Sequence, residues 1–525
     1  MTEVWTSLGK ARLEKLIGED VLTRLERLLP ALKPELTPLN IYSTRGLSSI
    51  FDSFAGGAAQ LEDPSFRDEV FNALTPERMS QLLKAVGYSG EELEWGQKVQ
   101  VLTKAWQTRT TAEKIVAALG ISPDLLPEEV SLRPDTLLVQ PATKPYKALK
   151  DYQYPVLCAA LQRLESPLAR FVVQMPTGSG KTRTAMEIVT QALNDQPAGT
   201  IVIWLAHSEE LCEQAYDSFE EVWTHVAQRP LQLVRSWGAK GALRSDFADS
   251  AFIVGSFAKL YGRLKKEPKA FLRVAARSFL LVVDEAHKII APSYTEVCRA
   301  LMGHQTRVMG LTATPGRSVR NEEENAKLAE FFFREIIGIE ESEGAVLDML
   351  RRRRILAETD YAPLRTTTSV QLTAREKSYL AKFLDLPPGL LARLGDDDIR
   401  NVEIVRRLQE EYERGGRILF FGCSVEHSKF VCALLNFLGC KSVHLDARTN
   451  RARRQTLIAD FRSGRVRVLC NYALLSTGFD APKTDVIFIA RPTQSIVLYS
   501  QMIGRGLRGP AIGGTEKCRV VDVID

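Results

Sequence analysis

The sequence predicts an α/β protein in which two tandem parallel-sheet domains follow an all-α N-terminal domain. Residues 1–130 place leucines at helical spacing, most clearly over residues 11–32. From about residue 150, short β-branched runs alternate with helical segments, and this alternation is typical of a parallel, doubly wound sheet. A second series of the same kind begins near residue 410, so two such sheets are expected.

The N-terminal part contains further helix signals but no catalytic constellation. Thr75 is placed to cap a helix whose first residue is Pro76, because proline needs no amide hydrogen bond at that position. Residues 110–119 form another expected helix. Three roles for residues 1–130 are open: a DNA-binding module, a partner-docking module or a structural brace.

The remaining boundaries follow from composition and from the strand candidates. Four prolines fall in residues 126–147, and residues 131–147 are therefore expected to be a linker. Residues 148–340 form the first α/β domain, residues 341–409 connect it to the second and begin that domain, and residues 410–525 complete it. The strands expected in the two sheets are 170–174, 200–205, 251–254, 279–283 and 307–311, then 417–421, 441–444, 466–470, 484–489 and 519–524.

Composition excludes several classes of protein. The 525 residues are too many for one core, and 45% hydrophobic with 25% charged residues is ordinary for a globular chain. No run of 18 apolar residues could span a membrane, and residues 1–10 lack the apolar segment of a signal peptide. The net charge of +5 is only a weak indication of polyanion binding.

The eight cysteines indicate a reducing compartment. None of them forms a C-x-x-C pair, so a zinc site is not expected, and several lie inside apolar runs. They are interpreted as reduced, mostly buried thiols of a cytoplasmic protein, nucleoid-associated in a bacterium, with the nucleus not excluded.

A glycine-rich loop between a strand and a helix predicts a phosphate site. Residues 175–182 read Met-Pro-Thr-Gly-Ser-Gly-Lys-Thr, which matches G-x-x-x-x-G-K-[ST] except that Met175 replaces the first glycine. Backbone amides in such a loop cradle phosphate oxygens, and the dipole of the next helix adds to their attraction. The residues expected to hold the ATP phosphates are Thr177, Gly178, Ser179, Gly180 and Lys181, and the Thr182 hydroxyl is expected to ligate Mg²⁺.

Two carboxylates follow an apolar strand about 100 residues downstream. Asp284 and Glu285 would lie at the carboxyl edge of the sheet, beside the phosphate loop. Asp284 is expected to hold Mg²⁺, and Glu285 to orient the attacking water. A lone histidine is usually structural, but His287 is expected to link this site to the next loop.

Taken together, the motifs resemble helicase superfamily 2 from about residue 145 to residue 525, and this resemblance implies two RecA-like domains. It implies that Gln153 reads the adenine edge, that Thr312 and Thr314 couple hydrolysis to domain movement together with His287, and that Asp480 contributes to ATP binding. The segments similar to family motifs are 150–153, 204–211, 254–257, 284–287, 311–315, 420–424, 476–480 and 501–508.

The last of these segments is expected to complete the ATP site from the second domain. If residues 501–508 are helical, Gln501, Arg505 and Arg508 share one face, because their offsets are four and three. Arginines that reach across an interdomain cleft stabilise the charge of the transition state. Gln501, Arg505 and Arg508 are therefore expected to be catalytic together with Lys181 and Glu285.

The residues of these motifs are similar to those of the XPB-type and type I/III restriction-subunit group. This resemblance implies DNA in preference to RNA. By resemblance, Ser208, Ser256, Ser424 and Thr477 contact the nucleic acid, with helix capping as the competing explanation for the serines. The arginine-rich stretch 448–467 could extend the track. Binding should be largely independent of sequence and sensitive to salt.

The expected function is that of an ATP hydrolase: an ATP-dependent DNA helicase or translocase that uses ATP and Mg²⁺. Two alternatives are open. One is an RNA helicase, and the other is an ATP-gated nucleic-acid-sensing subunit of a restriction, repair or anti-phage complex. Protein partners belong to that last alternative, and no membrane partner is expected.

Overall fold

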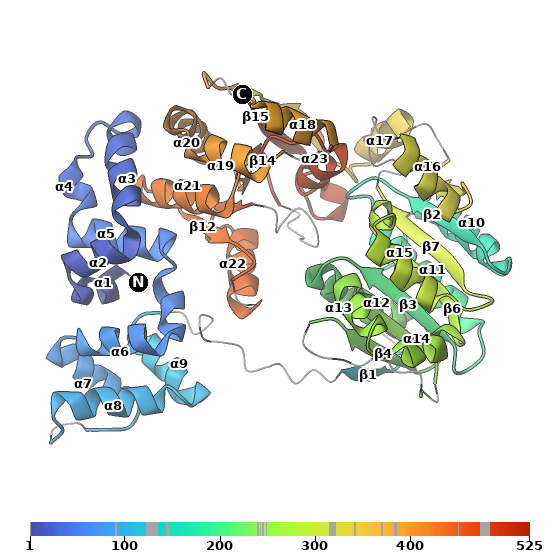
Figure 1. Ribbon diagram of the computed structural model, residues 1–525, viewed down its shortest axis with the longest axis horizontal. Coiled ribbons are helices and arrows are strands. Elements are labelled where there is room, and N and C mark those ends of the chain that lie inside the picture. Colours follow the sequence, from blue (N-terminus) through green and yellow to red (C-terminus); the bar gives the residue numbers. More distant parts are fainter. Residues whose placement is uncertain are drawn as a thin grey trace.

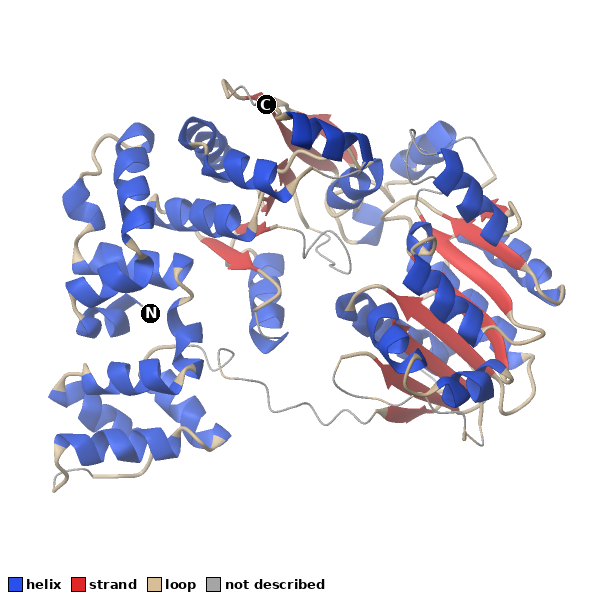
Figure 2. Ribbon diagram, in the orientation of Figure 1, coloured by secondary structure: helices blue, strands red, loops and turns tan. Residues whose placement is uncertain are grey.

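The computed structural model describes residues 2–89, 92–121, 126, 135–142, 147–238, 241, 243, 246–247, 249–313, 322–340, 343–368, 371–382, 386–449, 451–472 and 483–525. Along the chain these residues form a helical N-terminal domain and two α/β lobes, as Figure 1 and Figure 2 show. We call the lobes the first lobe, whose sheet lies within residues 136–338, and the second lobe, whose sheet lies within residues 358–524. The predicted fold class is confirmed.

The N-terminal domain is helical, as predicted, but its first long helix is broken. The segment 11–32 forms two helices because Gly18 has a left-handed φ of +96°, which interrupts the helical path between them. Thr75 caps its helix as expected, and its hydroxyl accepts a hydrogen bond from the Arg78 amide at 3.3 Å. The helices are α1 (Thr2–Trp5), α2 (Lys10–Ile17), α3 (Glu19–Leu32), α4 (Pro38–Ile41), α5 (Thr44–Phe54), α6 (Pro64–Asn72), α7 (Pro76–Ala85), α8 (Trp95–Ala105) and α9 (Arg109–Ala118).

The first lobe contains a sheet in the order β1-β4-β5-β3-β6-β7-β2-β8, in which only β1 runs antiparallel to its neighbour. The predicted strands are present, and β1, β4 and β8 are additional; β1 lies inside the predicted linker and pairs with β4. The strands are β1 (Thr136–Val139), β2 (Arg170–Gln174), β3 (Ile201–Ala206), β4 (Leu231–Ser236), β5 (Ala251–Ser256), β6 (Ser278–Asp284), β7 (Arg307–Thr312) and β8 (Ile336–Gly338).

Helices cover both faces of this sheet, so each face has its own apolar core. One face carries α10 (Gln153–Glu165), α11 (Lys181–Asn194) and α12 (Glu209–Val226). The other carries α13 (Phe257–Leu264), α14 (Pro268–Ala275), α15 (Pro292–Leu301) and α16 (Glu322–Phe331). The strands β3, β5 and β6 are buried along their whole length, and β5 and β6 end at the polar residues Ser256 and Asp284.

The second lobe has the strand order β10-β15-β14-β11-β13-β12, with β9 also paired to β15, and its described pairs are parallel. The predicted strands are again present. Its strands are β9 (Glu358–Tyr361), β10 (Leu364–Arg365), β11 (Ile418–Phe421), β12 (Ser442–Leu445), β13 (Val468–Asn471), β14 (Val486–Ile489) and β15 (Lys517–Ile524). Its helices are α19 (Pro388–Asp396), α20 (Asp398–Glu413), α21 (Val425–Phe437), α22 (Arg451–Ser463) and α23 (Ile496–Ile503), and α17 (Glu343–Arg352) and α18 (Ala374–Lys382) precede them.

The N-terminal domain packs against the second lobe rather than the first (Figure 1). Helix α5 lies on α21, and α3 lies on α20. Leu25 and Phe51 belong to the same buried cluster as Phe430 and Leu434 of α21, so the two parts share one apolar core. Within the described ranges, no helix combines the length and the hydropathy needed to cross a bilayer.

Candidate ATP site and nucleic-acid contacts

The phosphate loop lies between β2 and α11, as its sequence predicts. Gly178 and Gly180 have left-handed φ values of +86° and +87°, which a residue with a side chain adopts only at a cost. The Ser179 hydroxyl donates to the Pro176 carbonyl at 2.7 Å and closes the turn. Met175 is fully buried in the core of the lobe, so the residue that replaces the first motif glycine does not occupy the loop.

Gln153 braces this loop from α10. Its side-chain amide donates to the Thr184 hydroxyl at 2.8 Å, and its carbonyl accepts from the Lys150 amide at 2.8 Å. A Cβ on Gly180 would lie 2.6 Å from the Gln153 Nε2 atom, so a larger residue there would displace the Gln153 amide. The neighbouring Tyr152 hydroxyl donates to the Ser179 carbonyl at 2.7 Å, a contact that the sequence did not predict.

Asp284 ends β6, and Glu285 follows it in a left-handed conformation with φ of +52°. The Glu285 amide donates to Asp284 Oδ1 at 3.0 Å, and Lys181 Nζ lies 4.0 Å from Glu285 Oε1. Burial raises the pKa of Asp284 against the opposing charge of Lys181. Burial also acts against the charged form of Glu285, but Lys181 and His287 outweigh it and lower the pKa of that carboxyl. The ion pair therefore keeps Glu285 ionised.

His287 lies behind the carboxylates and reaches toward the following strand. Its Nδ1 atom is 3.4 Å from Glu285 Oε2 and 3.4 Å from the Thr312 hydroxyl. His287 and Thr312 are both buried, so this contact joins the turn of residues 286–288, which follows β6, to the end of β7. Thr314 lies outside the described residues.

The second lobe contributes to the same cavity, which has a volume of about 310 Å³. Gln501, Arg505 and Arg508 line it together with the phosphate loop and the two carboxylates. The described site residues around it are Gln153, Thr177, Gly178, Ser179, Gly180, Lys181, Thr182, Asp284, Glu285, Gln501, Arg505 and Arg508. Asp480, predicted to bind ATP as well, lies outside the described residues.

The expected helical face of residues 501–508 is wrong, although its three side chains do converge. Helix α23 ends at Ile503, a turn follows, and Arg508 lies in a β-bridge with Leu356. Two glycines explain the turn. A Cβ on Gly506 would lie 2.3 Å from Cys518 Sγ, and a Cβ on Gly504 would lie 2.1 Å from Thr177 Cγ2. The turn therefore brings this segment close to the phosphate loop.

Residues 355–357, in the segment that connects the two lobes, pass between the two halves of the site. The Ala357 amide donates to the Leu507 carbonyl at 2.8 Å, and the Gly509 amide donates to the Ile355 carbonyl at 2.8 Å. Leu356, between them, is buried and lies against the phosphate loop, 3.2 Å from the position of a Cβ on Gly178. These backbone bonds fix Arg508 relative to the first lobe.

Two of the predicted nucleic-acid contacts cap helices. The Ser208 hydroxyl accepts from the Leu211 amide at 3.3 Å, and the Ser424 hydroxyl accepts from the His427 amide at 3.0 Å. Ser256 begins α13 without such a bond and is 5% exposed. Thr477 lies outside the described residues. Capping is thus established for Ser208 and Ser424, and contact with a nucleic acid stays a prediction for all four residues.

The arginine-rich stretch makes a second contact between the lobes. Arg454 of α22 pairs with Glu210 in the first turn of α12 at 2.7 Å. Both side chains are partly buried, so this ion pair is less screened than one on the open surface. Among the described residues, the lobes therefore meet at this ion pair as well as at the ATP cavity.

Two family profiles match the chain. Residues 146–317 match the family described as "Type III restriction enzyme, res subunit", and residues 400–509 match the "Helicase conserved C-terminal domain". The chain belongs to helicase superfamily 2. Together the two matches cover the phosphate loop, the paired carboxylates and the arginine segment, in the order that this superfamily requires.

Curated relatives of this helicase agree with the match. A "Putative mitochondrial ATP-dependent helicase irc3" of Schizosaccharomyces pombe is 29% identical over 72% of the chain and 57% of that protein. The "Putative ATP-dependent helicase IRC3" of Saccharomyces cerevisiae is 24% identical over 72% and 51%, and a "51.5 kDa protein" of a Lactococcus phage is 27% identical over 64% and 62%. The chain thus spans between half and two thirds of the length of these relatives.

Solved structures share the fold. A putative HsdR subunit fragment of a type I restriction enzyme from Vibrio vulnificus has a TM-score of 0.51 at 17% identity, over 79% of this chain and 69% of that one. The Type ISP restriction-modification enzyme LlaBIII, titled as bound to DNA, has a TM-score of 0.53 at 17% identity, over 73% and 28%. At this identity the likeness establishes only the arrangement of two RecA-like lobes.

Proposed function

We propose that the protein is an ATP-dependent DNA helicase or translocase, which couples ATP hydrolysis to movement on DNA or to its remodelling. The observation that carries this proposal is the single cavity lined by Lys181 of the first lobe and by Arg505 and Arg508 of the second. Hydrolysis in such a cavity needs both lobes together. ATP binding and product release would then close and open the lobes, and a strand bound across them would be moved.

The residues around the cavity suit distinct tasks. Lys181 and the amides of residues 177–180 would hold the phosphates, and Gln153 would contact the adenine. Glu285, ionised beside Lys181, would orient the attacking water. Arg505, Arg508 and Gln501 would act on the charge of the transition state.

The donor set suits Mg²⁺. Asp284 and Thr182 line the cavity, and the described residues contain no cluster of three His, Cys, Asp or Glu side chains that would hold a metal alone. Mg²⁺ at nucleotide sites usually takes one or two protein ligands and completes its shell with phosphates and water. When bound, it would neutralise phosphate charge, and Asp284 and Thr182 would hold it.

Coupling to the nucleic acid is assigned to the residues behind and between the lobes. His287 and Thr312, which are in contact, and Thr314 would transmit the state of the site to the strand. Ser208, Ser256, Ser424, Thr477 and the arginine-rich stretch 448–467 would contact the sugar–phosphate backbone. Such contacts carry little sequence information. Because contacts with phosphates release bound counterions, binding should also depend steeply on salt.

DNA is proposed in preference to RNA because the first lobe matches the restriction-subunit family. A rice protein named "DEAD-box ATP-dependent RNA helicase 36" is also similar, at 22% identity over 59% of the chain. ATP hydrolysis measured with duplex DNA, single-stranded DNA and RNA of equal length separates the two. Stimulation by DNA is expected, and stimulation by RNA alone would contradict the choice.

The variant Glu285→Gln tests whether the protein hydrolyses ATP in repeated cycles or uses bound ATP only as a switch. This variant should bind ATP as the unchanged protein does and hydrolyse it at least about 100-fold more slowly, because the amide cannot accept a proton from water. Glu330→Gln, on the exposed side of the same lobe, is the matched control and should hydrolyse normally. Equal hydrolysis by the Glu285 and Glu330 variants would remove Glu285 from this role.

A reducing compartment, such as the cytoplasm, is part of the proposal. All eight cysteines are free thiols, and seven of them are buried. Treatment with a thiol reagent under native conditions should therefore label mainly Cys158, the exposed one.

A further inference from the structure

Arg24 of helix α3 contacts the second lobe with its whole guanidinium group. Its Nε atom donates to Asp398 Oδ1 at 2.7 Å, and its Nη2 atom donates to the Gly395 carbonyl at 2.9 Å. A third bond reaches Asp396 at 3.2 Å, and the group stacks on the Phe430 ring at 4.2 Å. The side chain is only 17% exposed, so these bonds are protected from solvent. Arg24 therefore fixes the junction of α19 and α20 to the N-terminal domain.

Gly395 connects Arg24 to buried residues of the second lobe. Its carbonyl accepts a second hydrogen bond, from Asn401 Nδ2 at 2.8 Å. A Cβ on Gly395 would lie 2.9 Å from the His427 Cβ atom, so the backbone of the junction lies directly on that histidine. Arg24 and Asn401 thus share one carbonyl acceptor, at a point that also packs against His427.

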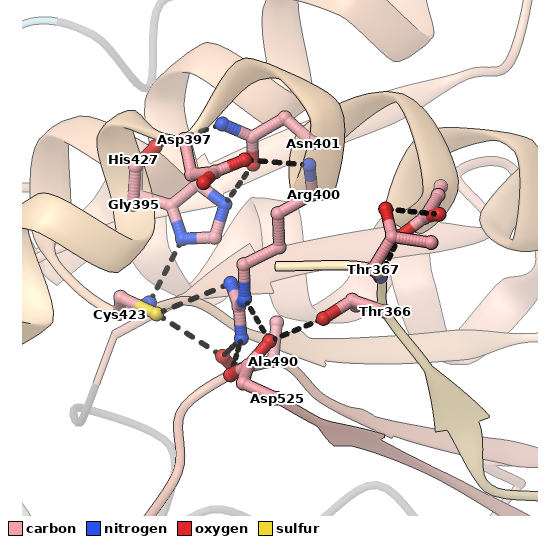
Figure 3. A network of polar contacts seen from close by, with 11 residues as sticks. Thr366, Thr367, Gly395, Asp397, Arg400, Asn401, Cys423, His427, Ala490 and Asp525 are labelled. Atoms are coloured by element: carbon pink, nitrogen blue, oxygen red, sulfur yellow. Dashed lines mark hydrogen bonds and ion pairs between the residues drawn. The ribbon is translucent and has the colours of Figure 1, made fainter. Parts of the chain in front are cut away.

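His427 connects the junction to the loop that follows β11, as Figure 3 shows. Its Nδ1 atom accepts from the Cys423 amide at 2.9 Å, so the ring proton resides on Nε2, which donates to Asn401 Oδ1 at 2.8 Å. The His427 amide also donates to the Ser424 hydroxyl at 3.0 Å. A single buried histidine thus holds both Cys423 and Ser424.

Arg400 holds the same loop from the other side. It is fully buried, pairs with Asp525 at 2.6 Å and donates to the Ala490 carbonyl at 2.6 Å and to Cys423 Sγ at 3.5 Å (Figure 3). Because these donors and acceptors are satisfied together and out of water, the network favours one arrangement.

We propose that Arg24 is a positioning residue for the loop of residues 422–424, which follows β11, so that the N-terminal domain sets how tightly the second lobe holds nucleic acid. The nucleic-acid half of this statement rests on the proposed function; the positioning half does not. Without Arg24, the Gly395 carbonyl loses one of its two donors and Asp398 loses its more buried partner. The junction can then move away from His427, and the loop loses its fixed support.

Hydrogen exchange tests the positioning directly, without ATP or nucleic acid. Arg24→Leu, which keeps the apolar contact with Phe430, should raise the exchange rate of residues 420–428 about tenfold. The matched control is Arg27→Ala. Arg27 also pairs with Asp398 from α3, but it is 66% exposed and has no described contact with Gly395, so exchange should stay unchanged. Equal exchange in the Arg24→Leu variant and the unchanged protein would overturn the proposal.

The effect on function is tested by the nucleic-acid dependence of ATP hydrolysis. Arg24→Leu should raise the DNA concentration for half-maximal stimulation about five- to tenfold and leave kcat and the KM for ATP within about twofold. Arg24→Lys should rescue only part of this loss, because an ammonium group cannot make the forked contacts of a guanidinium. A fall in kcat with an unchanged DNA requirement would contradict the proposal.

The contacts between Arg24 and the loop run through Gly395, Asn401 and His427. Asn401→Leu interrupts them and permits a double-mutant cycle. If Arg24 acts through Asn401 and His427, the double variant should lose no more than about twofold beyond the larger single loss. If the two single losses multiply in the double variant, Arg24 and Asn401 act independently. That result would overturn the proposed path through Asn401 and His427.

A misfolded second lobe is recognised by faster exchange in residues 468–470 of β13, which belong to the same lobe but lie outside the network, and the Arg24→Lys variant then replaces the leucine one. If DNA does not stimulate hydrolysis in the unchanged protein, the proposed function fails, and the exchange result still decides the positioning.

Discussion

Gly504 of the second lobe lies against Thr177 of the phosphate loop, so closely that a Cβ on Gly504 would come within 2.1 Å of Thr177 Cγ2. The contact joins the two halves of the ATP cavity at the residue before Arg505. Because a Cβ there would also come within 2.7 Å of the Thr177 Cβ atom, a side chain at position 504 must displace Thr177 or push the lobes apart.

Gly504→Ala should therefore lower kcat/KM for ATP about 10- to 100-fold, because the added methyl group costs a few kcal/mol in the closed arrangement. Steady-state hydrolysis measures this loss. Gly262→Ala is the matched control, since a Cβ on Gly262 meets nothing within 4 Å, and it should be neutral. Unchanged hydrolysis by Gly504→Ala would mean that the lobes react in a different arrangement.

Arg505→Ala and Arg508→Ala should each slow hydrolysis by about 10³-fold and leave ATP affinity within about threefold, since arginines of this kind act on the charge of the transition state. Single-turnover hydrolysis and equilibrium binding of a fluorescent ATP analogue separate the two effects. Arg465→Ala, on a side chain that is 67% exposed, is the control. A weakened affinity with an unchanged rate would instead make these arginines binding residues.

The sequence predicted the parts of the site that depend on local structure. The phosphate loop, its strand and the carboxylates after β6 are each contiguous, so residue types at fixed spacing were sufficient. The arginine segment was predicted to be helical because its offsets fit a helix, but Gly504 and Gly506 face Thr177 and Cys518 across the fold and end the helix early. Those packing partners are distant in sequence.

The position of the N-terminal domain was not predictable in this way. Leucines at helical spacing in α3 show that one face is buried but not what covers it. Arg24 and Gly395 are 371 positions apart, and either residue alone looks like an ordinary surface arginine or helix glycine. Only the structure places them within 2.9 Å.

The buried state of His427 predicts that the folded second lobe is less stable in mild acid than at neutral pH. Burial and the nearby charges of Arg400 and Arg24 hold the pKa of His427 well below its ordinary value of 6.5. A histidine whose pKa is lowered on folding binds a proton more readily when unfolded. Stability is therefore complete above pH 6.5 and falls as the pH drops below it, by about 1 kcal/mol at pH 5.5.

Thermal midpoints at pH 7.5 and pH 5.5 measure this effect. His427→Gln, which retains an acceptor and a donor but does not titrate, should have a lower midpoint at pH 7.5 and a smaller drop on acidification. His207 of the first lobe, whose pKa burial lowers to about 4, contributes equally to both proteins and cancels in the comparison. An identical drop in the two proteins would exclude His427 as a source.

Removal of the N-terminal domain should destabilise the second lobe and leave the first intact. A chain of residues 135–525 would expose the side of α20 and α21 that α3 and α5 now cover, and each large apolar side chain returned to water costs about 1.5–3 kcal/mol. We expect this chain to aggregate on size-exclusion chromatography. A chain of residues 135–357 keeps the first lobe together with α17, whose Leu350 lies in its core, and should remain monomeric. A monodisperse 135–525 chain with an unchanged melting midpoint for the second lobe would show that the shared core adds nothing to its stability.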